Sequence, residues 1–169
     1  MSLPTLKKIH EKLLYYLKPL RNPPKYTKEE KIRLASYIDC DGCIFGRHRS
    51  VIALRVSDAI YVVNLKERFK KIAKMGDIHL QKKKPNNVYE WNISRFKEIL
   101  HFLSNIKPYL ILKQRQAELS IEFIQSRIDR GVETIARLPY SDREREIVDE
   151  IQKLNRYKGY KSPKRRKRL

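Results

Sequence analysis

The chain has few cysteines and no long apolar run. Its 169 residues include only two cysteines, Cys40 and Cys43, which are too few and too close in sequence for a disulfide framework. The longest apolar runs, such as Tyr109 to Leu112, are far too short to span a bilayer, and the N-terminal segment lacks the apolar stretch of a secretory signal. We therefore expect an intracellular protein with no membrane span, in the cytoplasm or in an organelle matrix.

Acidic residues are also scarce. There are 19 Asp and Glu against 39 Lys and Arg, which gives a formal net charge of +20 and a pI near 10.1. This excess is far more than solubility needs, so a polyanionic partner is expected. Nucleic acid is the first candidate, and an acidic membrane surface is the second.

The first third of the chain predicts two helices and a hairpin. Thr5 to Leu17 has apolar residues at helical spacing and is followed by prolines, which predicts a helix and an extended linker. Thr27 and Glu30 have the spacing of a capping box, so a second helix is expected from Lys28 to about Asp39, ended by Gly42. A hairpin is expected over Cys43 to Ser57. The first 26 residues are thus an extension ahead of the main domain.

The remainder predicts a second hairpin flanked by helices. Three further helices are expected, over Val62 to Met75 with Gly76 as its terminator, Arg95 to Ile106, and roughly Leu112 to Arg130. In the second hairpin Ile78 and Leu80 share a face with Trp91 and Ile93 of the return strand. Ser141 and Glu144 predict a capping box for a last helix to about Asn155, and residues 156–169 form a basic tail.

This order predicts an α+β fold, α-β-β-α-β-β-α-α, in which helices pack on one face of an antiparallel four-stranded sheet. The main domain is expected over residues 27–155. The other face of the sheet would be polar and basic, and a concave basic sheet suits the groove of duplex DNA. The candidate DNA-binding residues on this face are Arg47, Arg49, Arg55, His79, Gln81, Lys83, Glu90 and Asn92.

The segment from Asp39 to Cys43 has two possible chemistries, Cys-x-x-Cys and Asp-x-Asp-Gly. A zinc site would need two further ligands, and the chain has no second Cys pair or suitably spaced His pair. A redox motif of the thioredoxin type would follow a strand, whereas here a helix is expected first. The two aspartates either end a helix in solvent or bind a cation, and an acidic helix C-terminus favours a compensating cation.

The same helix has small residues on one face. Ile32, Ser36 and Cys40 recur every four residues, and Ser36 with Cys40 forms a small-xxx-small pair that allows two helix backbones to approach closely. This face either packs inside the chain or meets a second copy across a two-fold axis. The second arrangement would bring two Asp41 side chains together.

Residues 34–42, LASYIDCDG, resemble the signature of the LAGLIDADG homing endonucleases. Six of the nine positions agree, namely Leu34, Ala35, Ile38, Asp39, Asp41 and Gly42. Residues 108–117, PYLILKQRQA, resemble the family's segment leading to an active-site lysine. The resemblance covers Thr27 to Arg130 and includes a single copy of the signature, which implies a homodimer whose signature helices form the central interface through Ile32, Ser36 and Cys40.

The resemblance implies a site-specific DNA endonuclease that acts in intron homing. Such an enzyme makes a staggered double-strand break at a long pseudo-palindromic site. It assigns metal binding to Asp41 and the carbonyl of Cys40, with Mg²⁺ as the expected cofactor and Mn²⁺ or Ca²⁺ able to occupy the same site. It assigns charge stabilisation to Lys113, and it places Asp58, just after the second strand, beside the hydrolytic water; a helix cap is the alternative for Asp58.

The signature helix departs from the family pattern at two positions, and two other functions are still possible. Ser36 and Cys40 replace the usual glycine or alanine, so the two helices are expected to lie slightly farther apart. The rival functions are an intron RNA maturase and a DNA-binding regulator that does not cleave. The presence of both Asp41 and Lys113 favours the nuclease.

Overall fold

The computed structural model describes residues 20, 22–47, 50–59, 63–81, 88–93, 95–130 and 140–156. The elements in order are α2 (Lys28–Cys40), β1 (Gly42–Arg47), β2 (Ser50–Ala59), α3 (Val63–Ala73), β3 (Asp77–Gln81), β4 (Val88–Ile93), α4 (Phe96–Ile106), the 3₁₀ helix η2 (Lys107–Tyr109), α5 (Gln114–Asp129) and α6 (Asp142–Leu154). The expected helix over Thr5 to Leu17 and nearly all of the basic tail lie outside the described residues. None of the described helices is long and apolar enough to cross a membrane.

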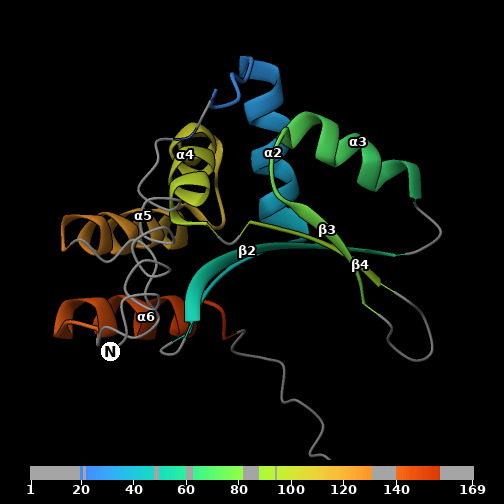
Figure 1. Cartoon of the computed structure of the whole chain (residues 1–169). Helices are drawn as coiled ribbons and strands as arrows, with labels where there is room; N and C mark the ends of the chain where they lie inside the picture. Colours follow the sequence, from blue (N-terminus) through green and yellow to red (C-terminus); the bar gives the residue numbers. More distant parts are fainter. Residues whose placement is uncertain are drawn as a thin grey trace, which may run out of the picture.

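The strands form one antiparallel sheet in the order β1-β2-β4-β3, so β1 and β3 are its edges. The two hairpins join through β2 and β4, where Val56 lies opposite Trp91 and Leu54 lies opposite Ile93. Figure 1 shows α2, α3 and α4 on one side of the sheet, while α5 and α6 lie at the end where β2 curves. The chain is therefore a mixed helix and antiparallel-strand domain.

The core lies between the sheet and the helices. Trp91 and Ile93 point into it from β4, and α2 contributes Leu34, Ala35 and Ile38, whose three- and four-residue spacing places them on one face of the helix. Trp91 packs edge-on against Phe69 of α3, with ring centroids 4.7 Å apart. Burial of one face of α2 fixes this helix across the sheet and leaves its opposite face in solvent.

Both predicted capping boxes are confirmed. Thr27 Oγ1 accepts a hydrogen bond from the Glu30 backbone N–H at 3.2 Å, and the Thr27 N–H donates to the Glu30 carboxylate at 2.8 Å. Ser141 and Glu144 make the same pair of bonds at 3.2 and 2.9 Å. These local signals place the starts of α2 and α6 correctly.

The predicted end of α3 is wrong by two residues. The helix ends at Ala73 because Lys74 adopts a left-handed conformation, with φ of 56°, and its ammonium donates to the Lys25 carbonyl at 2.9 Å and to Glu30 at 3.0 Å. Gly76, with φ of 79°, lies in the following turn, where a Cβ atom would be 2.6 Å from the Trp91 Nε1 atom. Contacts with distant parts of the chain thus override the glycine signal.

The edge strand β1 is covered by α6. Asn155 donates to the Ile44 carbonyl at 2.7 Å, and Gln152 donates to the Gly46 carbonyl at 3.2 Å. Carbonyls on a sheet edge need such partners when they are removed from water. The last helix therefore holds the first strand after the signature helix in place.

Candidate functional site

Asp41 lies between the end of α2 and the first residue of β1. It is the C-cap residue of the helix, its side chain is exposed, and its backbone N–H donates to the Tyr37 carbonyl at 3.0 Å. The next residue must be glycine, because a Cβ atom on Gly42 would lie 2.6 Å from the Cα atom and 2.8 Å from the carbonyl oxygen of Ile38. The close return of the chain against its own helix thus fixes the position of Asp41.

Asp39 ties the end of α2 to the segment before α5. Its side chain is buried, with the residue 8% exposed, and its two carboxylate oxygens accept hydrogen bonds from two backbone N–H groups. Oδ2 accepts from Ile111 at 2.7 Å, and Oδ1 accepts from Lys113 at 2.9 Å. Segments more than 70 residues apart are joined in this way.

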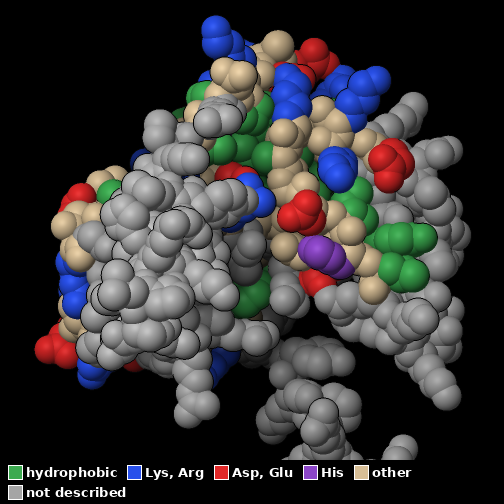
Figure 2. Space-filling model, in the orientation of Figure 1, with side chains coloured by type: hydrophobic (Ala, Val, Ile, Leu, Met, Phe, Trp, Pro, Cys, Tyr) green, Lys and Arg blue, Asp and Glu red, His purple; other side chains and the backbone are tan. Residues whose placement is uncertain are grey.

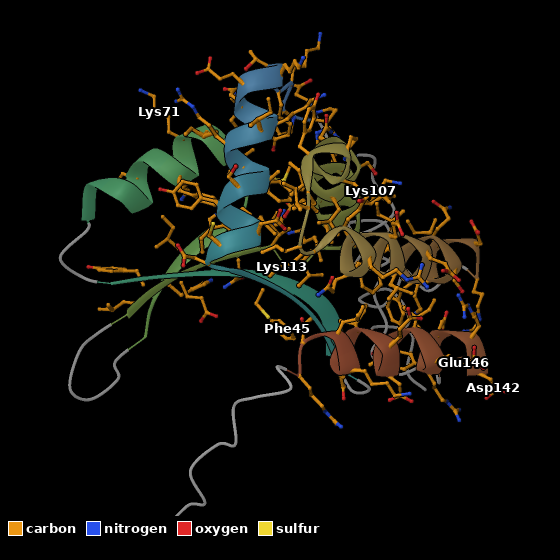
Figure 3. The ribbon with its side chains drawn as sticks, turned by 180° about the vertical axis from the view of Figure 1, so that it is seen from behind. Phe45, Lys71, Lys107, Lys113, Asp142 and Glu146 are labelled. Atoms are coloured by element: carbon orange, nitrogen blue, oxygen red, sulfur yellow. The ribbon has the colours of Figure 1, made fainter. Side chains whose placement is uncertain are left out.

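Lys113 completes the connection in the opposite direction. Its ammonium donates to the Ile38 carbonyl at 2.7 Å and also to the Asp39 carbonyl, both in the last turn of α2. Figure 3 shows Lys113 at the end of α2 that meets the sheet. A positive charge at a helix C-terminus is favourable, so Lys113 supplies a cation to this acidic helix end.

Lys113 is also the N-cap residue of α5, which begins at Gln114 rather than near Leu112 as predicted. The later start has a physical reason, since the bonds to Asp39 hold the Ile111 and Lys113 amides in the preceding segment. Asp41 and Lys113, chosen separately from the sequence, therefore lie at the same end of one helix.

The expected location of Asp58 is wrong. The second strand does not end before it but continues to Ala59, and Asp58 lies opposite Tyr89 of β4. A helix-cap position is excluded for the same reason. Pairing between the two hairpins extends β2, and the alternation of residues within one hairpin could not reveal it. The role proposed for Asp58 beside a water molecule stays a prediction.

The oxygen atoms at the end of α2 suit a hard divalent cation only in part. The Asp41 carboxylate and the Cys40 carbonyl are the kind of ligand that Mg²⁺ prefers. Within the described residues, however, no group of three or more His, Cys, Asp or Glu side chains could hold a metal. The described part of the chain thus supplies two candidate oxygen ligands at this helix end.

The cysteines form no disulfide, and no described cluster of side chains suits zinc. Cys40 is exposed at the end of α2, whereas Cys43 is half-buried in β1 and lies opposite Arg55. The two cysteines of the Cys-x-x-Cys motif therefore differ in their surroundings, one at a helix end and the other in a strand.

The candidate DNA-binding residues are spread over the strands. Arg55 lies opposite Cys43 on one side and Asn92 on the other, which places it in a row that crosses the sheet. His79 is exposed and Asn92 is half-buried. Arg47 and Gln81 lie in strands β1 and β3, whereas Arg49 and Lys83 lie outside the described residues.

The expected exposure of Glu90 is wrong. Glu90 is only 4% exposed, because it lies in an inner strand between Ser57 of β2 and His79 of β3. The prediction assumed that every residue on the face of the sheet away from the helices is exposed to solvent. This assumption fails for an inner strand such as β4, which has a neighbouring strand on each side.

Positive charge is not confined to the sheet. In Figure 2, Lys and Arg side chains gather at the top of the molecule, over the region of α2 and α3. The last turn of α3 carries the exposed Lys70 and Lys71, and Lys25 and Lys28 are exposed at the start of α2. Surface charge alone therefore does not identify the DNA-binding face.

Solved structures with a similar fold include homing endonucleases bound to DNA. The homing endonuclease I-CvuI, in complex with the I-CreI target in the presence of Mg, matches with a TM-score of 0.59 and 22% identity, over 79% of this chain and 86% of that chain. The archaeal intron-encoded homing endonuclease I-Vdi141I, complexed with DNA, matches with a TM-score of 0.59 and 18% identity, over 80% and 88% of the two chains. The LAGLIDADG homing endonuclease I-SmaMI, bound to cleaved DNA, matches with a TM-score of 0.54 and 18% identity, over 75% and 43%. The chain has the LAGLIDADG homing endonuclease fold. No protein-family model and no curated protein sequence matches it.

In this LAGLIDADG fold the signature helix α2 has one open face. Ile32 is 43% exposed, and Ser36 and Cys40 are exposed on the same side of the helix. The Ser36 hydroxyl donates to the Ile32 carbonyl at 3.0 Å, so its polar group is satisfied within the helix. The face that was expected either to pack inside the chain or to meet a second copy does not pack inside the chain.

Sequence reasoning missed the role of Asp39 in this LAGLIDADG fold. The sequence suggested that Asp39, like Asp41, either ends the helix in solvent or binds a cation. In the structure Asp39 is buried, and its carboxylate accepts both hydrogen bonds from the segment that carries Lys113. A carboxylate two residues before the candidate metal ligand gives no local signal of a partner so far along the chain. Only the tertiary structure reveals it.

Proposed function

We propose that the chain is a site-specific DNA endonuclease that cuts one phosphodiester in each strand and leaves a staggered double-strand break. The observation that carries the proposal is that Asp41 and the Lys113 ammonium lie at the same end of α2, next to the first strand of an antiparallel sheet. The resemblance to homing endonucleases solved with DNA supports the same activity.

The active unit is a homodimer, and its target is a long pseudo-palindromic site. A symmetric dimer presents the same patch on both subunits, and the open face of α2 has small residues at Ser36 and Cys40 and an exposed Ile32. Two further large apolar side chains lie near the end of α2, Ile111 at 84% and Leu112 at 72% exposure. Large apolar side chains exposed at one helix end are typical of an interaction surface.

The dimer explains why one chain offers so few metal ligands. Asp41 and the Cys40 carbonyl of each protomer would hold Mg²⁺, and Mn²⁺ or Ca²⁺ could occupy the same place. The bound cation would polarise the scissile phosphate and lower the pKa of the attacking water. Lys113, fixed at the same helix end, would stabilise negative charge that develops on the phosphate.

The sheet would read the DNA sequence. Side chains of its strands, among them Arg47, Arg55, His79 and Asn92, would contact base edges in the major groove. Lysines and arginines elsewhere would contact phosphates, which carry no sequence information but supply affinity. Glu90 is too deeply buried to be one of the readers.

Asp41→Asn tests this function. It should abolish cleavage of a selected target in the presence of Mg²⁺ and leave target affinity nearly unchanged, because the amide keeps the shape but is a poor Mg²⁺ ligand. Single-turnover cleavage and a binding assay in Ca²⁺ measure the two properties. Asp129→Asn is a matched control, since Asp129 is an exposed aspartate at the end of α5.

Three outcomes separate the possibilities. Loss of cleavage with retained binding supports the nuclease, and equal loss of both makes Asp41 a structural residue. Tight binding by the unaltered chain with no cleavage in Mg²⁺ or Mn²⁺ would instead support a regulator or an RNA maturase.

A further inference from the structure

We propose that Asp39 is the positioning residue of the active site: its carboxylate fixes the segment before α5 and thereby holds the Lys113 ammonium at the end of α2 that Asp41 caps. This inference rests on the proposed nuclease function, because it gives Asp39 a part in that reaction. Asp39 does not contact the reacting atoms in this account. It acts through Lys113.

The geometry is a two-way connection between one helix end and one loop. The Asp39 carboxylate accepts from the amides of Ile111 and Lys113, at 2.7 and 2.9 Å. The Lys113 ammonium donates in return to the carbonyls of Ile38, at 2.7 Å, and of Asp39. The backbone and the side chain of Lys113 are therefore both attached to the last turn of α2.

Few other contacts could take over this task. The two residues between Leu110 and Lys113 have side chains that face solvent, with Ile111 84% and Leu112 72% exposed, so packing does not hold them. Leu110 is buried and precedes them. From that anchor to the first turn of α5, the backbone amides of Ile111 and Lys113 are held by the bonds to Asp39, and the Lys113 carbonyl accepts from the Ala117 N–H at 3.0 Å.

The carboxylate is required because both partners are donors. An ionised carboxylate accepts through both oxygens, whereas an asparagine amide has one acceptor and one donor. In Asp39→Asn one of the two backbone N–H groups would face an NH₂ group. The segment should then move, and a displacement of about 1 Å in a catalytic group lowers rates roughly 100-fold.

The first experiment separates positioning from loss of stability. Asp39→Asn should lower the single-turnover cleavage rate at saturating protein by roughly 10- to 100-fold, with target affinity nearly unchanged. Thr27→Ala is the matched control, since it removes a side-chain hydrogen bond at the opposite end of α2 and leaves the loop untouched. The control should lower the melting temperature and leave cleavage nearly unchanged. Equal losses of cleavage in the two variants would overturn the proposal.

The second experiment asks whether Asp39 acts through Lys113. The cleavage rates of the unaltered chain, Asp39→Asn, Lys113→Met and the double variant are compared in a double-mutant cycle. The Asp39→Asn change should slow cleavage strongly when Lys113 is present and hardly at all when it is absent. The same loss in both backgrounds would mean that Asp39 acts independently of Lys113, and the proposal would be wrong.

A third readout needs no nuclease activity. The Ile111 and Lys113 amides should exchange hydrogen slowly in the DNA-free protein and quickly in Asp39→Asn, and acylation of the Lys113 amine should be faster in the variant. Unchanged exchange and acylation would refute the positioning role. If the unaltered chain binds DNA but never cleaves it, the nuclease function fails, while these two measurements still decide whether Asp39 sets the position of Lys113.

Discussion

The most informative substitution at the site is Gly42→Ala, because it adds one methyl group beside Asp41. The new Cβ atom would lie 2.6 Å from the Ile38 Cα atom and 2.8 Å from its carbonyl oxygen. Both neighbours are backbone atoms, so no side chain can turn away to make room. Reaching the lower limit of ordinary contact, 3.4 Å, requires a movement of about 0.8 Å.

That displacement gives the expected magnitudes. Forcing an extra methyl group into a packed site costs about 1–3 kcal/mol of unfolding free energy. A shift of this size between Asp41 and Lys113 should slow the chemical step by a further factor of roughly 100. Gly42 is the first residue of β1, so the rest of the sheet that would read the DNA should keep its pairing, and specific binding should decline far less than cleavage.

The assay is single-turnover cleavage at saturating protein, together with a melting curve. Gly76→Ala is the matched control, since its Cβ atom would lie 2.6 Å from Trp91 Nε1 in a turn with φ of 79°. The control should lose stability and, below its melting temperature, retain its cleavage rate. If Gly42→Ala cleaves at the unaltered rate, or if both variants slow equally, the reasoning about this close approach is wrong.

Two further predictions concern stability and assembly. Glu144→Ala should lower the free energy of unfolding in urea by about 3–5 kcal/mol, because Glu144 is fully buried and its carboxylate neutralises the buried Arg127. The control Glu122→Ala breaks an exposed ion pair with Arg143 and should lower it by less than about 1 kcal/mol. Burial raises the pKa of Glu144, but hydrogen bonds from Ser141 and Arg130 outweigh this effect and hold that pKa below its usual value. The ionised Glu144 should therefore stabilise the fold above pH about 4.3, and this stabilisation should be lost as the pH falls through the folded-state pKa. Glu144→Ala should remove this pH dependence of the unfolding free energy. Ser36→Leu should convert the proposed dimer to monomers in sedimentation velocity, and an unchanged profile would contradict the proposed interface.

Much of the fold could be predicted from local signals. Thr27 with Glu30 and Ser141 with Glu144 marked two helix starts, since a cap depends only on neighbouring residues. The ends of elements were less predictable where distant contacts decide them. Lys74 ends α3 through its bonds to Lys25 and Glu30, and pairing with β4 extends β2 past Asp58.

The site was predictable residue by residue but not as an arrangement. The signature pointed to Asp41, and a separate segment pointed to Lys113. The two segments are joined by hydrogen bonds from backbone amides to the Asp39 carboxylate and from Lys113 to a backbone carbonyl of α2. Every residue has such backbone groups, so the sequence does not show which of them pair. The exposure of Glu90 failed for a related reason, because its burial depends on strands that are neighbours only in the folded sheet.

Site-specific cleavage can be measured by selecting cleaved molecules from a library of random DNA duplexes incubated with the protein and Mg²⁺. We expect one long pseudo-palindromic sequence to be enriched, with a nick in each strand at symmetric, staggered positions, and we expect Asp41→Asn to yield none. Enrichment of a bound sequence whose strands both remain intact would contradict this expectation.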